Sequence, residues 1–267
     1  MDIGELALQA QIEWFRLLAA CGCPQATVQD GFAVSSGLAS NSENGAVVAP
    51  EILDRPEDLD RLLAWLRQLE LPAILVVTRP IDLEAVGRLT RRGLVPENSG
   101  NEMGRTLGPA DLIGASDVIG TVAPPGGADV GEVADEGGLR DSYRVYQGDG
   151  WWEDPGELER EVEVAVQLGF GPGQPIRHWV ARLDGEPVGA ATSFRFGDTL
   201  YLAHCCVAAP LRRRGLATLL TRARLAAAAA QGATHAVLSP SPDGYLLHRS
   251  LGFDLAPTPP NRSFYLF

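Results

Sequence analysis

The stretch Val207–Ala217, VAAPLRRRGLA, combines an apolar run, three consecutive arginines and a glycine directly before an alanine-rich segment. Small residues leave the backbone of such a turn open, and the N-terminus of a following helix presents N–H groups that have no partner within the helix. These N–H groups, the helix dipole and the arginine side chains favour an anion, and a pyrophosphate suits them better than a single sulfate. The sequence therefore predicts a phosphate-binding turn at Arg212–Ala217.

Two histidines and one tyrosine are the candidates for acid–base chemistry. His248 lies in the sequence LLHRSLGF, Tyr245 lies about one helical turn before it, and His204 precedes the arginine turn. An imidazole can exchange a proton near neutral pH. Strand alternation predicts that His204 shares a face with Leu202 and Cys206. The alternatives are a satisfied core histidine for His204 and a packed or solvent-facing helix histidine for His248.

The four cysteines lie in two close pairs, Cys21 with Cys23 and Cys205 with Cys206. These spacings match neither a zinc site nor a C-x-x-C redox motif. Burial in apolar surroundings raises the pKa of a thiol, which argues against a cysteine nucleophile. We therefore expect reduced structural cysteines, no metal site and a cytoplasmic protein.

The charge balance limits the partners of this chain. Its 267 residues carry 22 arginines and no lysine against 34 aspartates and glutamates, which gives a formal net charge of −12. This acidity disfavours general binding of nucleic acids or anionic membranes, so any anion must be held by a local site. No stretch approaches the roughly 20 unbroken apolar residues of a membrane span. Acidic residues within the opening segment favour an amphipathic helix over a signal peptide.

The elements that would position these residues indicate an α/β protein. In the first part of the chain we expect strands at 30–34, 45–48, 73–78 and 101–107 and helices at 56–69, with Asp54 as its N-cap, and at 83–92. The segment 123–138, rich in proline, glycine and acid, is expected to be a loop near a lobe boundary. Beyond it we expect helices at 157–168, 218–231 and 245–251 and strands at 177–183, 187–196, 199–207, 235–239 and 263–267. This order places a helix N-terminus beside the carboxyl end of a central strand, where open α/β sheets bind ligands.

Two motifs together resemble the GNAT N-acetyltransferase superfamily. R-x-x-G-x-A at Arg212–Ala217 is similar to its coenzyme A loop, Q/R-x-x-G-x-G/A, and SPDGYLLHRSLGF at 241–253 is similar to its later helix, which ends in Leu-Gly-Phe. The resemblance covers about residues 116–267. It implies an α/β (α+β) GNAT fold, a mixed central sheet with splayed strands flanked by helices, in a domain over residues 114–267.

The N-terminal lobe, residues 1–113, resembles a degenerate GNAT-like half. Its strand at 73–78, its helix at 83–92 and the following Arg-Gly-Leu are similar to the end of a GNAT domain, but it contains no R-x-x-G-x-G/A loop. The resemblance therefore implies a tandem protein with two lobes, of which the N-terminal one is structural.

The resemblance also implies acetyl-CoA as co-substrate. Its pantetheine arm would pair with the backbone of Cys206, Val207 and Ala209. The residues that would hold its pyrophosphate are Arg212, Arg213, Arg214, Gly215, Leu216, Ala217 and Thr218. A primary amine of a small molecule or an aminoacyl group would attack the thioester directly, and the protein would act as a monomer or a homodimer.

The expected catalytic residues depart from the family pattern. The family often places a proton-donating tyrosine four residues before the glycine of Leu-Gly-Phe, and His248 occupies that position, with Tyr245 as the second candidate acid. The strand 199–207 contains no glutamate that could act as a base. Two alternatives therefore stand beside an N-acetyltransferase. One is a non-catalytic acyl-CoA-binding or sensor protein, and the other is an acyltransferase for longer acyl groups or oxygen nucleophiles.

The sequence Trp-Trp-Glu-Asp at 151–154 lies where GNAT enzymes usually build the wall of the acceptor site. These residues would offer an aromatic surface and carboxylates to a cationic amine. The alternative is that they form part of the core and the cap of the following helix.

Overall fold

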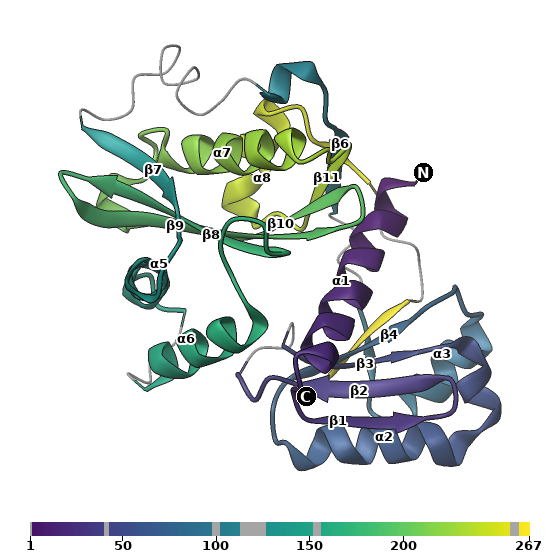
Figure 1. Ribbon diagram of the computed structural model, residues 1–267. Coiled ribbons are helices and arrows are strands. Elements are labelled where there is room, and N and C mark those ends of the chain that lie inside the picture. The colour runs from purple at the N-terminus through teal and green to yellow at the C-terminus, as the bar shows by residue number, and fades with distance from the viewer. Residues whose placement is uncertain (1, 40–42, 98–101, 113–126, 152–155, 257–261) are drawn as a thin grey trace. The chain divides into compact units, whose positions relative to one another are not determined.

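The computed structural model describes residues 2–39, 43–97, 102–112, 127–151, 156–256 and 262–267 (Figure 1). The chain forms two compact units. One combines Met1–Ala7 with Asn101–Ala256, and the other combines Leu8–Gly100 with Pro257–Phe267. The boundary between Ala7 and Leu8 lies inside helix α1 (Ile3–Ala20). In the described part of the chain, no helix is long and apolar enough to cross a membrane.

The second of these units contains a six-stranded mixed sheet in the order β1-β2-β3-β4-β13-β5. Strands β3 and β4 are parallel because helix α2 carries the chain back between them, and the neighbouring pairs are antiparallel. Its elements are β1 (Gln25–Val28), β2 (Gly31–Ser35), β3 (Asn44–Val48), the 3-10 helix η1 (Pro50–Asp54), α2 (Pro56–Gln68), β4 (Ala73–Val77), α3 (Leu83–Thr90), β5 (Val95–Pro96) and β13 (Ser263–Leu266).

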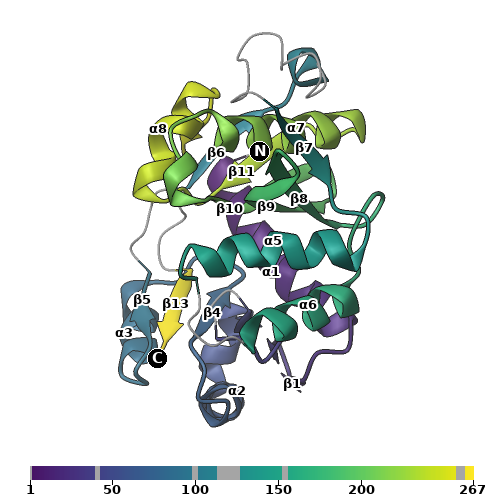
Figure 2. The ribbon, with the colours of Figure 1, turned by 90° about the vertical axis from the view of Figure 1, so that its left-hand side faces the viewer.

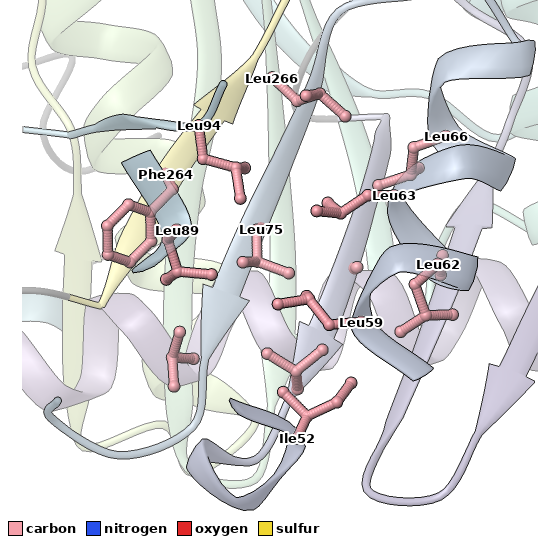
Figure 3. Close-up of a cluster of buried hydrophobic side chains, with 14 of the residues drawn as sticks. Ile52, Leu59, Leu62, Leu63, Leu66, Leu75, Leu89, Leu94, Phe264 and Leu266 are labelled. Carbon is pink, nitrogen blue, oxygen red and sulfur yellow. The ribbon is translucent and has the colours of Figure 1, made fainter. Parts of the chain in front are cut away.

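Helix α2 covers this sheet with a stripe of buried leucines at helical spacing (Figure 3). The core that they form with Leu75 of β4 and Phe264 of β13 is apolar throughout. The leucines of the stripe are Leu59, Leu62, Leu63 and Leu66. The expected N-cap at Asp54 is wrong. Arg55 takes that place without a capping side-chain bond, because Pro56 begins the helix with a φ angle that already suits it.

Gly45 of β3 lies at a close approach between two strands and helix α1. A Cβ added at this position would lie 2.5 Å from the backbone oxygen of Ile74 and 2.5 Å from the ring of Phe15. Because a backbone oxygen cannot move aside as a flexible side chain can, we expect Gly45→Ala to lower the free energy of unfolding by about 1–3 kcal/mol.

Gly131→Ala is the matched control for that substitution. Gly131 also lies in a strand, β7 (Ala128–Glu132), but no heavy atom lies within 4 Å of its added Cβ. Denaturant unfolding of the two variants measures the difference in free energy. Equal stability of the two alanine variants would contradict the close packing at Gly45.

The first unit contains a seven-stranded sheet in the order β12-β6-β11-β10-β9-β8-β7. Helices α7 and α8 cover one face of this sheet, and α5 and α6 cover the other (Figures 1 and 2). Its further elements are β6 (Met103–Thr106), η2 (Pro109–Leu112), α5 (Glu136–Gly148), α6 (Glu157–Leu168), β8 (Ile176–Leu183), β9 (Glu186–Phe196), β10 (Thr199–Val207), η3 (Ala209–Leu211), α7 (Leu216–Ala230), β11 (His235–Leu238), α8 (Pro242–Ser250) and β12 (Asp254–Leu255).

Two strands belong to the sheet of the other expected lobe, because they lie on one side of the expected boundary between residues 113 and 114 and pair with strands on the other side. β6 pairs with β11 and β12 in the seven-stranded sheet, whereas the C-terminal strand β13 pairs with β4 and β5 in the six-stranded sheet. The expected segments 1–113 and 114–267 therefore do not coincide with the two compact units. The order of elements along a sequence does not reveal such an exchange, because a strand pairs with whichever neighbour satisfies its backbone groups.

Candidate active site

Strands β10 and β11 run side by side at their beginnings and then separate. Residues 199–201 of β10 pair in parallel with 235–237 of β11, but β10 continues to Val207 while β11 ends at Leu238. On its other side β11 pairs with β6. The second half of β10 therefore has no strand partner on its β11 side among the described residues. Three carbonyl oxygens of this half already accept from arginine side chains, those of Ala203 and His204 from Arg224 and that of Val207 from Arg212. The remaining backbone groups on the open side are available to an extended ligand arm that contains amide groups.

A β-bulge changes the direction of the side chains in β10. Leu202 pairs with Ser193 and Cys205 pairs with Ala191, so that two residues of β10 lie opposite Thr192 alone. An extra residue in one strand moves every later side chain to the other face. Leu202 accordingly packs against α7 and α8, whereas Cys206 packs against α5. The expectation that His204 shares a face with both of them is wrong, because it assumes an unbroken alternation.

His204, within this bulge, lies among aromatic rings on the α5 face. Its ring centre lies 4.7 Å from that of Trp151 and 5.8 Å from that of Tyr146, both edge to face. Desolvation among these rings, followed by the nearby charge of Arg224, lowers the pKa of His204 below its usual range. The residue is nevertheless exposed. His204 is therefore not a buried core histidine. It presents a neutral imidazole beside Trp151, whose side chain is also partly open to solvent.

The N-terminus of α7 has no capping side chain among the residues that the structure describes. Its N-cap is Gly215, with φ 88° and ψ −5°, and no side chain caps the helix. Its first turn contains no acidic residue, whereas α3, α5 and α8 are capped by the side chains of Asp82, Asp135 and Ser241. Among the α-helices that the structure describes, α7 alone combines both features. Its first N–H groups and its positive dipole end are therefore available to an anion.

The three arginines before α7 have different surroundings. The side chain of Arg212 donates through Nε to the carbonyl oxygen of Val207 at 3.0 Å and forms an ion pair with Asp149 at the end of α5. Arg213 has a left-handed φ of 63°, and both it and Arg214 are exposed. Arg212 therefore fixes the turn to the protein, which leaves the side chains of Arg213 and Arg214 as the cations best placed to assist a bound phosphate.

Comparison with known proteins identifies this architecture. Residues 143–253 match the model of the acetyltransferase (GNAT) family. This segment belongs to the GNAT superfamily. A GNAT protein from Kribbella flavida has 19% identity and a TM-score of 0.62, and the match covers 99% of this chain and 95% of that one. A tandem GNAT protein from the clavulanic acid biosynthesis pathway has 13% identity and a TM-score of 0.53, with 97% and 94% covered.

These structural matches show the fold alone. They confirm the expected α+β GNAT fold in its tandem, two-lobe form. A conserved protein of unknown function from Staphylococcus epidermidis matches over 92% of this chain and 93% of its own, with 12% identity and a TM-score of 0.55. No curated protein matches the sequence significantly.

The two units of the chain repeat one order of elements: three antiparallel strands, a 3-10 helix, an α-helix, a parallel strand and another α-helix. In the N-terminal copy, β3 and β4 stay paired along residues 45–48, and the Thr78 N–H extends that pairing to the carbonyl oxygen of Val48. Helix α2 begins with Pro56 and carries Glu57 and Asp58 in its first turn. This copy therefore has neither separated strands nor a helix start that suits an anion.

His248 of the GNAT domain lies in α8, buried with 9% of its surface exposed. Its ring meets Phe253 edge to face at 5.5 Å, and its Nδ1 has no hydrogen-bond partner among the described residues. Burial first, and then the charge of Arg224, lower the pKa of His248 to about 4. The imidazole is therefore neutral at pH 7. Tyr245, one turn earlier, is half-buried and packs against the same apolar cluster.

The four cysteines are free thiols, as the sequence predicts. Burial raises the pKa of Cys206 to about 12 and also raises the pKa of Cys205. Both thiols are therefore protonated at neutral pH and poor nucleophiles. In the residues that the structure describes, no group of three or more histidine, cysteine, aspartate or glutamate side chains is arranged to hold a metal ion.

Proposed function

We propose that this protein is an acetyl-CoA-dependent N-acetyltransferase that transfers the acetyl group directly to a primary amine of a small molecule or an aminoacyl group. The observation that carries the proposal is the separation of β10 from β11 directly before the uncapped N-terminus of α7. An open strand edge suits the amide groups of a pantetheine arm, and the helix start suits the pyrophosphate that lies at the other end of that arm.

Each part of the site has a role in this proposal. The backbone of Cys206, Val207 and Ala209 pairs with the pantetheine arm. The turn from Arg212 to Thr218 holds the pyrophosphate, mainly through main-chain N–H groups. The bulge in β10 lies before these residues, so the thioester would lie near it and the acceptor would enter beside His204 and Trp151. A cationic acceptor also agrees with the net charge of −12.

The transfer itself needs no covalent acyl-enzyme. The nitrogen of a neutral amine attacks the thioester carbonyl carbon, the C–N bond forms, and the C–S bond breaks to release coenzyme A. The nitrogen loses one proton and the departing sulfur gains one. His204, neutral and exposed, is placed to accept the proton of the amine directly or through water. His248, with Tyr245 as the second candidate, is placed to donate a hydrogen bond to the sulfur.

The proposal is tested by mixing the protein with acetyl-CoA and a panel of primary amines, with detection of free coenzyme A and of the acetylated amine by mass spectrometry. We expect both products to appear in equal amounts. The replacement of the family tyrosine by a buried histidine favours a second candidate, an acyl-CoA-binding protein without transfer. Saturable binding of acetyl-CoA without either product would support that candidate and contradict the proposed transfer.

A further inference from the structure

Arg224 is a buried arginine at the centre of the seven-stranded sheet's α7 face. It has 1% of its surface exposed. Its Nη1 donates to the carbonyl oxygens of Thr192 at 3.0 Å, Ala203 at 3.3 Å and His204 at 3.4 Å. These three carbonyls belong to the residues that form the bulge between β9 and β10. The guanidinium therefore joins helix α7 to the point where β10 changes the direction of its side chains.

The charge of Arg224 has no opposite charge beside it. Its further bonds go to the carbonyl oxygen of Leu220 and to the hydroxyl oxygen of Thr221, both at 3.3 Å. Among the described residues, no carboxylate forms an ion pair with it. A guanidinium stays protonated even when buried, and burying a charge without a partner is costly. A cost of this kind is typical of a functional site rather than of a structural core.

The two imidazoles of the candidate active site lie on opposite faces of the seven-stranded sheet. His204 belongs to the α5 face, and His248 belongs to α8 on the α7 face. The titratable groups that face Arg224 are Tyr146 from α5 and Cys205 from β10, both uncharged at neutral pH.

The surroundings of each imidazole contain few other charges that act on it. His204 also faces Tyr146 of α5 and His178 of β8, whose pKa is itself lowered to about 3 by burial. The ring of His248 faces Phe253, and the titratable residues nearest to it along its own helix are Tyr245 and Arg249. After burial, the charge of Arg224 is the second cause that lowers the pKa of each of the two imidazoles.

We propose that Arg224 is a positioning residue for acetyl transfer: its guanidinium, bonded to the carbonyl oxygens of Thr192, Ala203 and His204, holds the bulge that turns His204 toward the acceptor side, and its charge acts on the imidazoles on both faces of the sheet. The proposal rests on the proposed transferase function. Because neither imidazole is protonated at neutral pH, the guanidinium of Arg224 is the positive charge available near the bulge. Neutral His204 accepts a hydrogen bond from the attacking amine, whose proton passes on to water, and neutral His248 donates a hydrogen bond to the departing sulfur. The permanent cation behind the bulge favours the negative charge that develops on the thioester.

Titration of the histidines by NMR tests the proposal without any substrate. The chain contains four histidines, so that His178, His204, His235 and His248 can each be followed in protein labelled with ¹⁵N-histidine. In the wild type, His204 and His248 should both titrate well below pH 6. In Arg224→Met and Arg224→Gln both midpoints should rise, by about one pH unit, because a positive charge that disfavoured the imidazolium has been removed.

Matched variants separate the charge from the packing. Arg222→Met removes an arginine from the same helix, where Arg222 is half-buried, and should leave both midpoints unchanged. Arg224→Gln removes the charge but keeps a hydrogen-bond donor near the bulge. If Arg224→Met does not fold, the glutamine variant still measures the effect of the charge on the two midpoints. A wild-type midpoint above pH 6 for either histidine, or no rise for either of them in the glutamine variant, would overturn the proposal.

The pH profile of kcat/KM distinguishes the proposed role of Arg224 from a purely structural one, because a purely structural role would not shift this profile along the pH axis. Loss of packing alone would lower the rate at every pH. Loss of the charge should also move the acid limb of the profile upward by the same amount as the NMR midpoints. If the wild type transfers no acetyl group to any amine, the proposed function fails, but the NMR titrations still decide whether Arg224 controls the two imidazoles.

Discussion

Replacing Thr218 by glutamate should weaken the binding of acetyl-CoA by about 100-fold, which is about 2.8 kcal/mol of binding free energy. Thr218 is half-buried in the first turn of α7, where the structure shows no capping side chain and no acidic residue. A carboxylate in this turn interacts favourably with the helix dipole, so the fold should be retained. The same carboxylate would repel the pyrophosphate and compete with it for the free N–H groups.

Thr218→Gln is the matched control, because it has nearly the same size as glutamate without the charge. Calorimetry with acetyl-CoA should show a loss of no more than about tenfold for this variant, which is about 1.4 kcal/mol. A second pair of variants, at Gly215, separates the effect of side-chain size from that of backbone strain. Gly215→Ala places a small side chain at a left-handed φ of 88°, whereas Gly215→Glu should also block the approach of a phosphate. Unchanged affinity in both glutamate variants would contradict the assignment of the turn.

The turn could be predicted from the sequence because its properties are local. Arg212–Ala217 carries its own small residues and charges, and the following helix supplies N–H groups that no distant segment needs to position. What remained hidden is the ion pair between Arg212 and Asp149, which joins the turn to the end of α5. A pairing of residues so far apart in sequence depends on the tertiary fold. It shows that the side chain of Arg212 also supports the turn from within the protein.

The bulge and Arg224 could not be predicted from strand periodicity. Strict alternation in β10 assigns one face to Leu202, His204 and Cys206, but an extra residue opposite Thr192 separates them. Arg224 did carry a signal in the sequence, since it continues the four-residue spacing of Leu216 and Leu220 on the buried face of α7. A charged residue on such a stripe is an indication that the interior provides acceptors for it.

Helix α5 is absent from the sequence prediction, which places its first residues in a loop. The glycines and acidic residues before it resemble a linker, and the signals for a helix are weaker. They are Asp135, which caps the helix by accepting from the Gly138 N–H at 2.8 Å, and the spacing of Leu139, Tyr143 and Tyr146. Helix α5 supplies the ring of Tyr146 beside His204. A sequence prediction without this helix therefore misses the aromatic surroundings of His204.

His248→Ala should lower kcat by about 100-fold while it changes the KM for acetyl-CoA only a few-fold. His248 lies on α8, away from the turn that would bind the pyrophosphate, so its loss should affect the chemical step rather than cofactor affinity. Tyr245→Phe should cause a smaller loss, because its ring packing is kept. The matched control is Leu246→Ala, since Leu246 is 70% exposed on the same helix and should leave kcat unchanged.

The pH dependence of kcat distinguishes the two ways in which His248 can act. With a pKa of about 4, the imidazole is neutral from pH 6 to pH 8. If the neutral form is the active one, the contribution of His248 is constant across that range and is lost only as the pH falls through about 4. If the imidazolium were the required acid, the rate would fall tenfold for each pH unit above the pKa and would be very low at pH 7. A flat profile in the wild type, together with the loss in His248→Ala, would therefore identify a neutral hydrogen-bond donor to the departing sulfur, whereas a steady fall from pH 6 to pH 8 would contradict it.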